Sequence, residues 1–372
     1  MSRLLATLLI GLAIFGSISL HGFSLRNGMN DMIEADRVHN LIADGIPNPF
    51  MGKLTGVAAV DYMLFTLVNF FWPVCQAETP GLTLVGVVFG GQMVALFTLV
   101  MIEGFREGSK GRLVGFIGIY VFLFQTVGYA IFAPAYLAIF VLTSPTFATP
   151  TASNLIVSHV DAIPFGILFG YLPLSVVIAL PYPAILSLKQ KVLAIIFWQP
   201  TAHYAIYISK ILSSLSPHKA KTSSIHRQLM HLRAAYKFAL LFAVPAHLYV
   251  WTLSLTSMFW PSLFSAEARE SLHPLNALIP PNPLKAWNAE AESIGQASLW
   301  LLQWDYWVGS ISYMIFAVAA KSYATGKMGS KELAAAIGRM LALGPVAAAL
   351  TLLWDRDEAV FEKAEKLGKK ES

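Results

Sequence analysis

Long apolar runs recur from one end of this sequence to the other, and most are about twenty residues long. A run of that length crosses the roughly 30 Å hydrocarbon core of a bilayer as a helix. The pattern predicts eight spans and one uncertain segment, 192–212; the spans are 4–23, 57–76, 82–103, 113–133, 164–188, 238–260, 299–324 and 333–354. We therefore predict an all-α, polytopic membrane bundle over residues 1–354, followed by a charged tail, 355–372.

Composition excludes several classes of protein. With 56% hydrophobic and only 13% charged residues, the chain does not resemble a soluble domain of this size. The single cysteine, Cys75, excludes an internal disulfide and a cysteine-based metal site. The net charge of +5 lies mostly in short loops, so it indicates membrane orientation and not nucleic-acid binding. No HExxH, GxSxG, CxxC or P-loop motif is present, so no metal or nucleotide cofactor is expected.

The first apolar run, 4–23, has two interpretations. Arg3 and the small residues Gly16 and Ser17 are compatible with a cleaved signal peptide. The apolar core is long for such a signal, so we favour an uncleaved first span.

The polar stretch 24–55 contains Asp31, Glu34 and Asp36, which resemble the Mg²⁺-diphosphate motif of membrane prenyltransferases. The stretch lies before the expected span, however, and no second Asp-rich motif follows. An amphipathic helix at the membrane interface explains the same residues, with Met32 among its apolar positions. We favour this second interpretation.

Basic residues are concentrated in certain loops. Lys and Arg occur in 104–112, 189–191 and 321–331, and none occur in the loops after the second and fourth spans. The positive-inside rule therefore places these basic loops in the cytosol. The most basic loop, 213–237, joins them only if 192–212 does not cross the bilayer and is re-entrant or interfacial.

The span 57–76 has one face that combines an acid, an amide and two aromatic rings: Asp61, Phe65, Asn69 and Trp72. A carboxyl group inside hydrocarbon is costly, so it marks a functional site by default. This face could line a cavity that holds an apolar ligand.

Two further acids lie near span ends, Glu103 in the third span and Asp305 in 299–324. The topology above places Asp61 and Glu103 toward the cytosolic leaflet and Asp305 toward the other. Other polar and aromatic residues are expected to contact the same ligand: Gln92, Gln125, Tyr129, Trp304 and Trp307.

A carboxyl group in an apolar pocket tends to stay protonated, because burial disfavours its charged form. Asp61, Glu103 and Asp305 are therefore candidates for a general acid. Nearby aromatic faces can stabilise a carbocation. Such a set suits proton-initiated cyclisation of a polyprenyl chain, with Asp61 starting the reaction and Asp305 stabilising or terminating the cation. Each acid can equally be a structural hydrogen-bond partner between helices.

The stretch 61–73 (DYMLFTLVNFFWP), the segment Glu103–Arg106 (EGFR) and the aromatic fourth span resemble a fungal family. These are the membrane-bound terpene cyclases of meroterpenoid pathways, of the ascochlorin and ascofuranone type, and the resemblance covers nearly the whole chain. It implies a membrane enzyme of the endoplasmic reticulum that cyclises an epoxidised farnesyl side chain on an aromatic polyketide. The expected partners are a hydrophobic prenylated aromatic molecule and the lipid bilayer, with no nucleic acid and no metal or other cofactor.

Two other functions are also compatible with the residues. A small-molecule transporter would use intramembrane acids and proline-broken helices, although no inverted repeat is visible. A Mg²⁺-dependent prenyltransferase would use Asp31, Glu34 and Asp36, and metal dependence would distinguish it from a cyclase.

Overall fold

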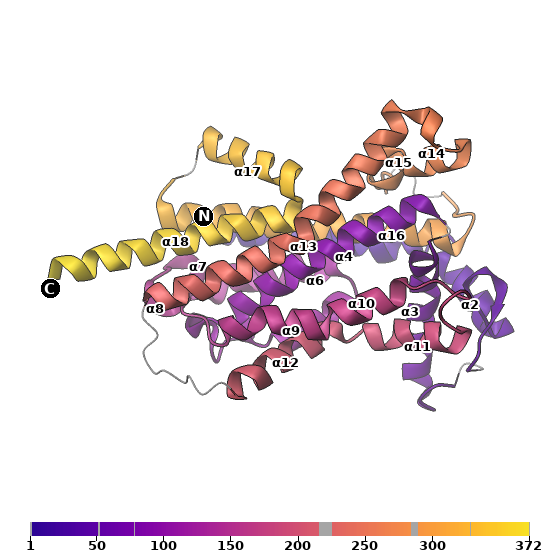
Figure 1. The fold of residues 1–372 in the computed structure, drawn as a ribbon, viewed down its shortest axis with the longest axis horizontal. Coiled ribbons are helices and arrows are strands. Elements are labelled where there is room, and N and C mark those ends of the chain that lie inside the picture. The colour runs from indigo at the N-terminus through magenta and orange to yellow at the C-terminus, as the bar shows by residue number, and fades with distance from the viewer. Residues whose placement is uncertain are drawn as a thin grey trace.

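The computed structural model describes residues 2–50, 53–77, 79–215, 225–283, 289–327 and 329–371. The long helices run mostly along one axis (Figure 1) and include α1 (Ser2–Ser17), α4 (Pro80–Gly104), α13 (Ile225–Phe259), α16 (Ile294–Thr325) and α18 (Pro345–Glu371). In the described part of the chain, five stretches are long and apolar enough to span a membrane: Ser2–Gly22, Ala58–Gln76, Pro80–Gly104, Val160–Ala179 and Ile225–Phe259. The predicted all-α polytopic bundle is confirmed.

Short elements join the long helices. The helices are α2 (Met29–His39), α7 (Pro145–Ala148), α8 (Ala152–Leu155), α14 (Ala266–Leu272), α15 (Pro274–Ala277) and α17 (Ser330–Leu343). One turn of π-helix, η1 (Ile18–Gly22), follows α1. The 3₁₀ turns are η2 (Ala43–Gly45), η3 (Glu107–Ser109), η4 (Leu113–Gly115), η5 (Val160–Ala162) and η6 (Pro261–Leu263). Strands β1 (Leu41–Ile42) and β2 (Ile46–Pro47) pair antiparallel. Met29 and Ile33 of α2 are buried, and its charged residues are largely exposed, as an amphipathic helix requires.

The predicted fourth span is two half-helices, α5 (Ile117–Thr126) and α6 (Tyr129–Thr143). They are separated at Gly128, whose φ of 135° is a conformation that favours glycine. At the outer ends, Arg112 Nη1 donates to the Thr143 carbonyl at 3.0 Å. The two halves therefore form a re-entrant hairpin, which we call the α5–α6 hairpin: it enters and leaves at one end of the bundle, and its tip is Gly128.

Two broken helices follow. The first consists of α9 (Ile163–Gly170) and α10 (Leu172–Ala179), and the second consists of α11 (Leu188–Trp198) and α12 (Thr201–Leu215). Helix α12 returns alongside α9, where Gly166 lies so close to Ser209 that a Cβ atom would not fit. His159 Nδ1 and Ser213 Oγ lie 2.6 Å apart and close this pair at its far end. The uncertain segment 192–212 therefore runs back along α9 and α10.

This topology decides which basic loops share an end of the bundle. The Ser158 N–H donates to the Phe105 carbonyl at 3.0 Å, and the next residue, His159, contacts Ser213 at the end of α12. The loop 104–112 therefore lies beside the end of α12. The ring of Tyr323, 5.0 Å from that of Phe147, brings the loop after α16 to the same end. The loop 213–237 begins there too, although residues 216–224 lie outside the described part. The expectation that 189–191 shares this side is wrong, because α11 begins at the other end (Figure 1).

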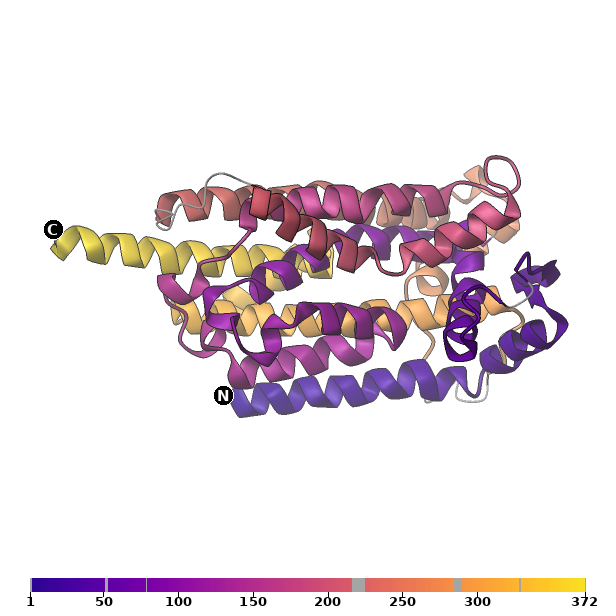
Figure 2. The ribbon, with the colours of Figure 1, turned by 90° about the horizontal axis from the view of Figure 1, so that it is seen from below.

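Helix α3 (Ala58–Gln76) runs across the bundle axis at that other end, as the two perpendicular views show (Figures 1 and 2). Lys191, whose side chain is fully buried, fixes it there by donating to the carbonyls of Cys75 (2.8 Å), Ile178 (2.7 Å) and Leu180 (2.8 Å). A cation at the carboxyl ends of two helices complements their dipoles. Asp61 on α3 and Glu103 in the last turn of α4 lie at opposite ends of the bundle, so the expectation that they share one side is wrong.

The charged tail expected from residue 355 begins later. Arg356, Asp357 and Phe361 on α18 are buried within the bundle. Arg356 and Asp357 are buried because they form an ion cluster with the end of α4, described below. The buried part of α18 therefore extends past residue 355.

The α5–α6 hairpin gives a topology prediction. In a Cys75→Ser background, single cysteines introduced at Lys110 and Thr149, which flank the hairpin, should both react with a membrane-impermeant maleimide from the same side. A cysteine at Glu267, in the first turn of α14, should react only from the other side. Opposite-side labelling of positions 110 and 149 would show that this segment crosses the bilayer.

Candidate active site

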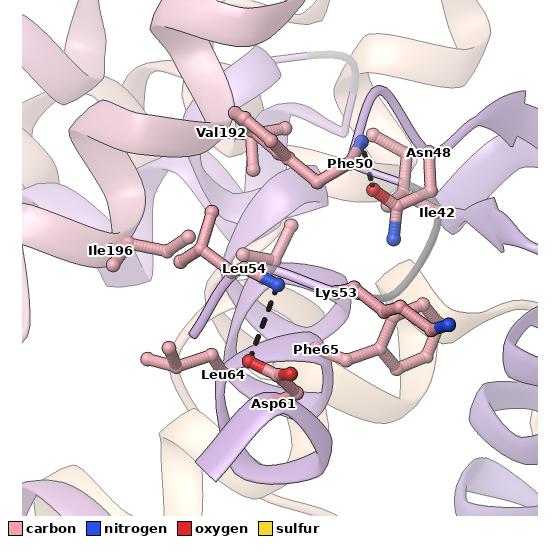
Figure 3. Close-up of a pocket in the computed structure, with 11 residues that line it drawn as sticks. Ile42, Asn48, Phe50, Lys53, Leu54, Asp61, Leu64, Phe65, Val192 and Ile196 are labelled. Carbon is pink, nitrogen blue, oxygen red and sulfur yellow. Dashed lines mark hydrogen bonds between the residues drawn. The ribbon is translucent and has the colours of Figure 1, made fainter. Parts of the chain in front are cut away.

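Asp61 closes the turn that leads into α3 (Figure 3). Its Oδ1 accepts hydrogen bonds from the N–H and hydroxyl of Thr55, both at 2.7 Å, and from the Leu54 N–H at 3.3 Å. Its Oδ2 accepts from the Gly56 N–H at 3.0 Å. Both oxygens are therefore occupied by donors, and the geometry gives Asp61 the role of a cap for this turn.

The cavity beside Asp61 is small. Its volume is about 30 Å³, and Figure 3 shows Phe65 and Lys53 on one side and Val192 and Ile196 of α11 on the other. A space of this size accommodates a water molecule or two and not a prenyl chain.

The rest of the predicted α3 face, Phe65, Asn69 and Trp72, is buried one, two and three turns further on. Asn69 donates to the Phe65 carbonyl at 3.1 Å, and the ring of Trp72 lies 5.6 Å from that of Tyr182. The Asn69 Oδ1 and Trp72 Nε1 atoms have no hydrogen-bond partner within the described chain. These residues do face inward together, as predicted, but toward the packing interface with the segment after α10.

Glu103 belongs to a buried ion cluster that we call the α4–α18 ion cluster, formed with Arg106, Arg356 and Asp357. Glu103 Oε1 accepts from Arg106 Nη2 at 2.9 Å and from Arg356 Nη2 at 2.7 Å. Asp357 accepts from Arg106 Nη2 at 2.8 Å and from the Tyr236 hydroxyl at 2.7 Å. The two acids and two arginines balance in charge, and all four side chains are at most 4% exposed.

The two carboxylates of the cluster keep the guanidinium group of Arg106 protonated although it is buried. Burial alone lowers the pKa of Arg106, but the carboxylates of Asp357 and Glu103 outweigh it and hold that pKa above its usual range. Removing one member of such a cluster leaves an uncompensated buried charge. Glu103 thus joins α4 to α18 and is surrounded by guanidinium groups.

The two predicted glutamines also join helices. Gln92 Nε2 donates to the carbonyls of Ala243 and Leu343, both at 3.1 Å. Its Oε1 accepts from the N–H groups of Val346 and Ala347, both at 3.0 Å, which are the first amides of α18. Gln125 donates to Gln199 Oε1 at 2.6 Å, which links α5 to the break between α11 and α12.

Asp305 lies at the tip of the α5–α6 hairpin. Its Oδ1 accepts from the Ala130 N–H at 2.7 Å, and the Tyr129 N–H also faces this carboxyl group. Gly128, the residue at the N-cap of α6, has no side chain, so Asp305 caps the half-helix from α16. Among the described residues, no Lys, Arg or His forms a salt bridge with Asp305, in contrast to Glu103.

Aromatic rings surround this tip in a group that we call the hairpin-tip aromatic cluster: Phe89, Phe124, Tyr129, Tyr306 and Tyr313. The ring of Tyr129 lies 5.8 Å from those of Phe89 and Phe124 and 6.2 Å from that of Tyr313. Phe89 in turn lies 5.6 Å from Tyr306. Gly309, one turn after Asp305, provides the space for the Tyr129 ring, because a Cβ atom there would lie 2.4 Å from it.

Three buried hydroxyl groups lie in this region, those of Tyr129, Ser310 and Tyr313. The Tyr129 and Ser310 hydroxyls face each other, but none of the three makes a hydrogen bond of good geometry within the described chain. Buried polar groups are nearly always paired, so unpaired ones call for an explanation such as a ligand or water. Next to Tyr306 lies a hollow of about 10 Å³, also lined by Gln303 and Trp307. The Gln303 Oε1 atom is unpaired as well.

The two predicted tryptophans of α16 are held by backbone carbonyls. Trp304 Nε1 donates to Pro281 at 3.1 Å, with its ring 5.2 Å from that of Phe15, and Trp307 Nε1 donates to Leu278 at 2.7 Å. Trp307 lines the hollow and Trp304 faces α1.

The structure therefore assembles some predicted residues and separates others. Asp305 and Tyr129 meet at the hairpin tip, with Trp307 beside the adjoining hollow, whereas Asp61 and Glu103 lie at opposite ends of the molecule. Sequence reasoning did not find the other cluster members: Phe89, Phe124, Tyr306 and Tyr313. Gly128 in the middle of an apolar run was the available signal, since a glycine there indicates an interrupted helix.

Comparisons with known proteins agree over nearly the whole chain. The model of the CtvD domain matches residues 5–361. Terpene cyclase ascI from Acremonium egyptiacum is 32% identical over 377 residues, covering 98% of this chain and 94% of that protein. Terpene cyclase ctvD from Aspergillus terreus is 27% identical over 362 residues, covering 95% and 99%. Terpene cyclase janA from Penicillium janthinellum is 27% identical over 357 residues, covering 95% and 94%. No solved structure matches the chain.

The α4–α18 ion cluster predicts a large loss of stability for Glu103→Gln. The substitution leaves two buried arginines facing one carboxylate, so we expect the free energy of unfolding to fall by about 3–5 kcal/mol. Thermal unfolding of the detergent-purified protein measures it. The matched control is Glu107→Gln, which breaks the exposed pair with Lys110, leaves an amide oxygen for the exposed Ser158 hydroxyl, and should cost at most about 1 kcal/mol. Equal losses in the two variants would contradict the structural role of Glu103.

For Asp61→Asn we expect a smaller, local loss. The amide can satisfy only part of the four donors that face the carboxyl group, so we expect about 1–3 kcal/mol of destabilisation. The turn before α3 should also become more susceptible to proteolysis. Asp31→Asn, on the exposed face of α2, serves as the control; if Asp61→Asn is as stable as that variant, Asp61 is not the cap of this turn.

Proposed function

The chain belongs to the CtvD-domain family of fungal terpene cyclases, and from that premise we propose that it cyclises a farnesyl side chain by acid catalysis. The proposed substrate is an aromatic meroterpenoid precursor whose farnesyl chain carries a terminal epoxide. The proposed location is the endoplasmic reticulum membrane, from which so apolar a molecule can enter the bundle sideways.

The observation that supports this proposal is the position of Asp305 at the hairpin-tip aromatic cluster. Of the three predicted acids, Glu103 is bound by two arginines and Asp61 accepts hydrogen bonds on both oxygens. Asp305 has no salt-bridge partner among the described residues and lies beside Tyr129. We therefore assign the initiating proton to Asp305 and not, as the sequence suggested, to Asp61.

In the proposed reaction, the Asp305 carboxyl group donates its proton to the epoxide oxygen as the adjacent C–O bond breaks. Electrons of a chain double bond form the new C–C bond, and the positive charge moves along the chain. The faces of Tyr129, Tyr306 and Phe89 stabilise that charge by cation–π attraction, which acts within about 6 Å of a ring centre. A proton is finally lost from carbon, so the product is an isomer of the substrate.

The buried hydroxyl groups near Asp305 can carry the proton that the cation loses back to the Asp305 carboxylate. Tyr129, Ser310 and Tyr313 can bind a water molecule or the new alcohol of the product between α6 and α16. A relay through them would return the proton to Asp305, which starts the next turnover with the same acid.

The chain must open to admit a substrate of this size. The hollow beside Tyr306 is about 10 Å³, and the rings of the aromatic cluster are in contact with one another. Displacement of the α5–α6 hairpin from α16 would separate these rings, and the break at Gly128 allows its tip to change direction.

The alternative functions receive less support. Glu34, one of the acids of the prenyltransferase hypothesis, is paired with Arg37 on the exposed side of α2. Within the described chain, no three His, Cys, Asp or Glu residues are grouped in a way that could hold a metal ion. Intramembrane half-helices are also typical of transporters, but the relatives described above are named as cyclases.

The proposal predicts that Asp305→Asn abolishes turnover without unfolding the protein. Asparagine caps a helix as well as aspartate does but has no acidic proton, so turnover should fall by about 100-fold or more. Microsomes containing the variant are given an epoxyfarnesyl phenol, and mass spectrometry measures conversion to an isomer of unchanged mass. Protein level and thermal stability are measured on the same preparations.

Two control variants distinguish Asp305 from Asp61 as the acid, and a cyclase from a metal-dependent prenyltransferase. Asp61→Asn should retain most turnover per folded molecule, and the double variant Asp31→Asn, Glu34→Gln should react as the natural protein does, with or without EDTA. Full activity of a folded Asp305→Asn protein would exclude Asp305 as the acid. Loss of activity in EDTA would favour the metal-dependent prenyltransferase.

A further inference from the structure

An apolar groove of about 450 Å³ lies between α1, α16 and α17. Representative lining residues are Leu5, Leu8, Met314, Val318, Ala336 and Met340. The polar residues that reach it are Ser322 and Tyr323, and the Tyr323 hydroxyl already lies 3.0 Å from Ser2 Oγ. Its volume is within the usual range for a small-molecule site, and its lining suits a hydrocarbon chain.

The groove faces the surrounding lipid. Its borders include Leu4 on α1 and Leu333 and Ile337 on α17, which are 76%, 54% and 46% exposed. Ala319 and Ala336 line it as well, and their small side chains leave the space that larger residues would fill. Helix α17 contacts α13 and α18 on its other side, so it forms a wall of the groove.

Basic residues lie at the end of the groove where α1 begins and α17 follows α16. Arg3 precedes Leu4, Lys331 is two residues before Leu333, and Lys327 lies in the connection between α16 and α17. The contact between Ser2 and Tyr323 brings the two elements together there.

These three cations lack a salt bridge to any carboxylate of the described residues. In contrast, Lys321 and Arg339 nearby both pair with Asp355, at 2.6 and 2.7 Å. Glu332 is the acid closest to the group in sequence, so the charges of Arg3, Lys327 and Lys331 leave a net positive mouth.

We propose that this groove is a binding site for an anionic phospholipid, with one acyl chain in the groove and the phosphate at Arg3, Lys327 and Lys331. Apolar contacts cannot select a lipid in the bilayer, because lipid tails are as apolar as the groove. Selection must therefore come from the head group, and basic residues near a membrane surface attract anionic lipids. The site lies on a different face of α16 from Asp305, and the proposal does not depend on the proposed function.

The test uses the full-length protein purified in a neutral detergent. Native mass spectrometry measures binding of dioleoyl phosphatidylglycerol and dioleoyl phosphatidylcholine, added separately. We expect tighter binding of the anionic lipid, decreasing as ammonium acetate concentration rises. The triple variant Arg3→Gln, Lys327→Gln, Lys331→Gln should weaken anionic binding roughly 100-fold, at about fivefold for each cation.

A filling variant tests the groove independently of the charges. Ala319→Phe should reduce binding of both lipids by occupying the space for the acyl chain. The control for the triple charge variant is Lys363→Gln, Lys366→Gln on the exposed end of α18, which removes lysines away from the groove and should bind as the natural protein does.

Equal binding of the two lipids, or unchanged anionic binding by the triple variant, would overturn the phospholipid assignment. Unchanged binding by a folded Ala319→Phe protein would overturn the placement of the chain in the groove. Cyclase activity is not the readout, so these outcomes do not bear on the acid role of Asp305.

Discussion

Backbone groups at the ends of helices have no partner in a bilayer unless the protein supplies one, and this constraint determines the architecture. The bundle contains several broken helices, and polar side chains from other elements satisfy their ends. Asp305 caps the start of α6, and His21 Nε2 lies 2.9 Å from the carbonyl of Val127, the residue that follows α5. Gln92 bridges the break before α18, and Lys191 binds the carboxyl ends of α3 and α10. Contacts between residues far apart in sequence, such as Asp305 with Ala130 and Gln92 with Val346, therefore fix several of these breaks.

The same constraint explains how far sequence reasoning could go. Apolar period and length predicted the helical bundle, and family motifs such as Glu103–Arg106 predicted the enzyme class. A polar residue in an apolar run has the same appearance whether it caps a helix or transfers a proton, however. Asp61, Glu103 and Asp305 became distinguishable only through their partners, which come from the turn 54–57, from α18 and from α6. The α5–α6 hairpin was missed because its halves together are as long as a span.

The proposed mechanism links the chemistry to this architecture at Asp305. A carboxylate interacts with the amino end of a half-helix more strongly than a neutral acid does. Protonated Asp305 would therefore bind α6 less tightly, and the hairpin tip at Gly128 would move more easily in the state that is ready to react. Loss of the proton would strengthen the cap again. On this mechanism, admission of the substrate and the protonation state of the acid favour each other.

The α4–α18 ion cluster has a consequence for the synthesis of the protein. Glu103 and Arg356 are 253 residues apart, so the ribosome needs roughly 10–50 s to make the second partner after the first, at about 5–20 residues per second. During that interval α4 is already available for membrane insertion, and Arg106, one turn from Glu103, can neutralise its charge locally. The complete cluster forms only when the last helix arrives. A chain that stalls before residue 356 would therefore hold the Glu103–Arg106 pair at the end of α4 without the contacts that join this helix to α18.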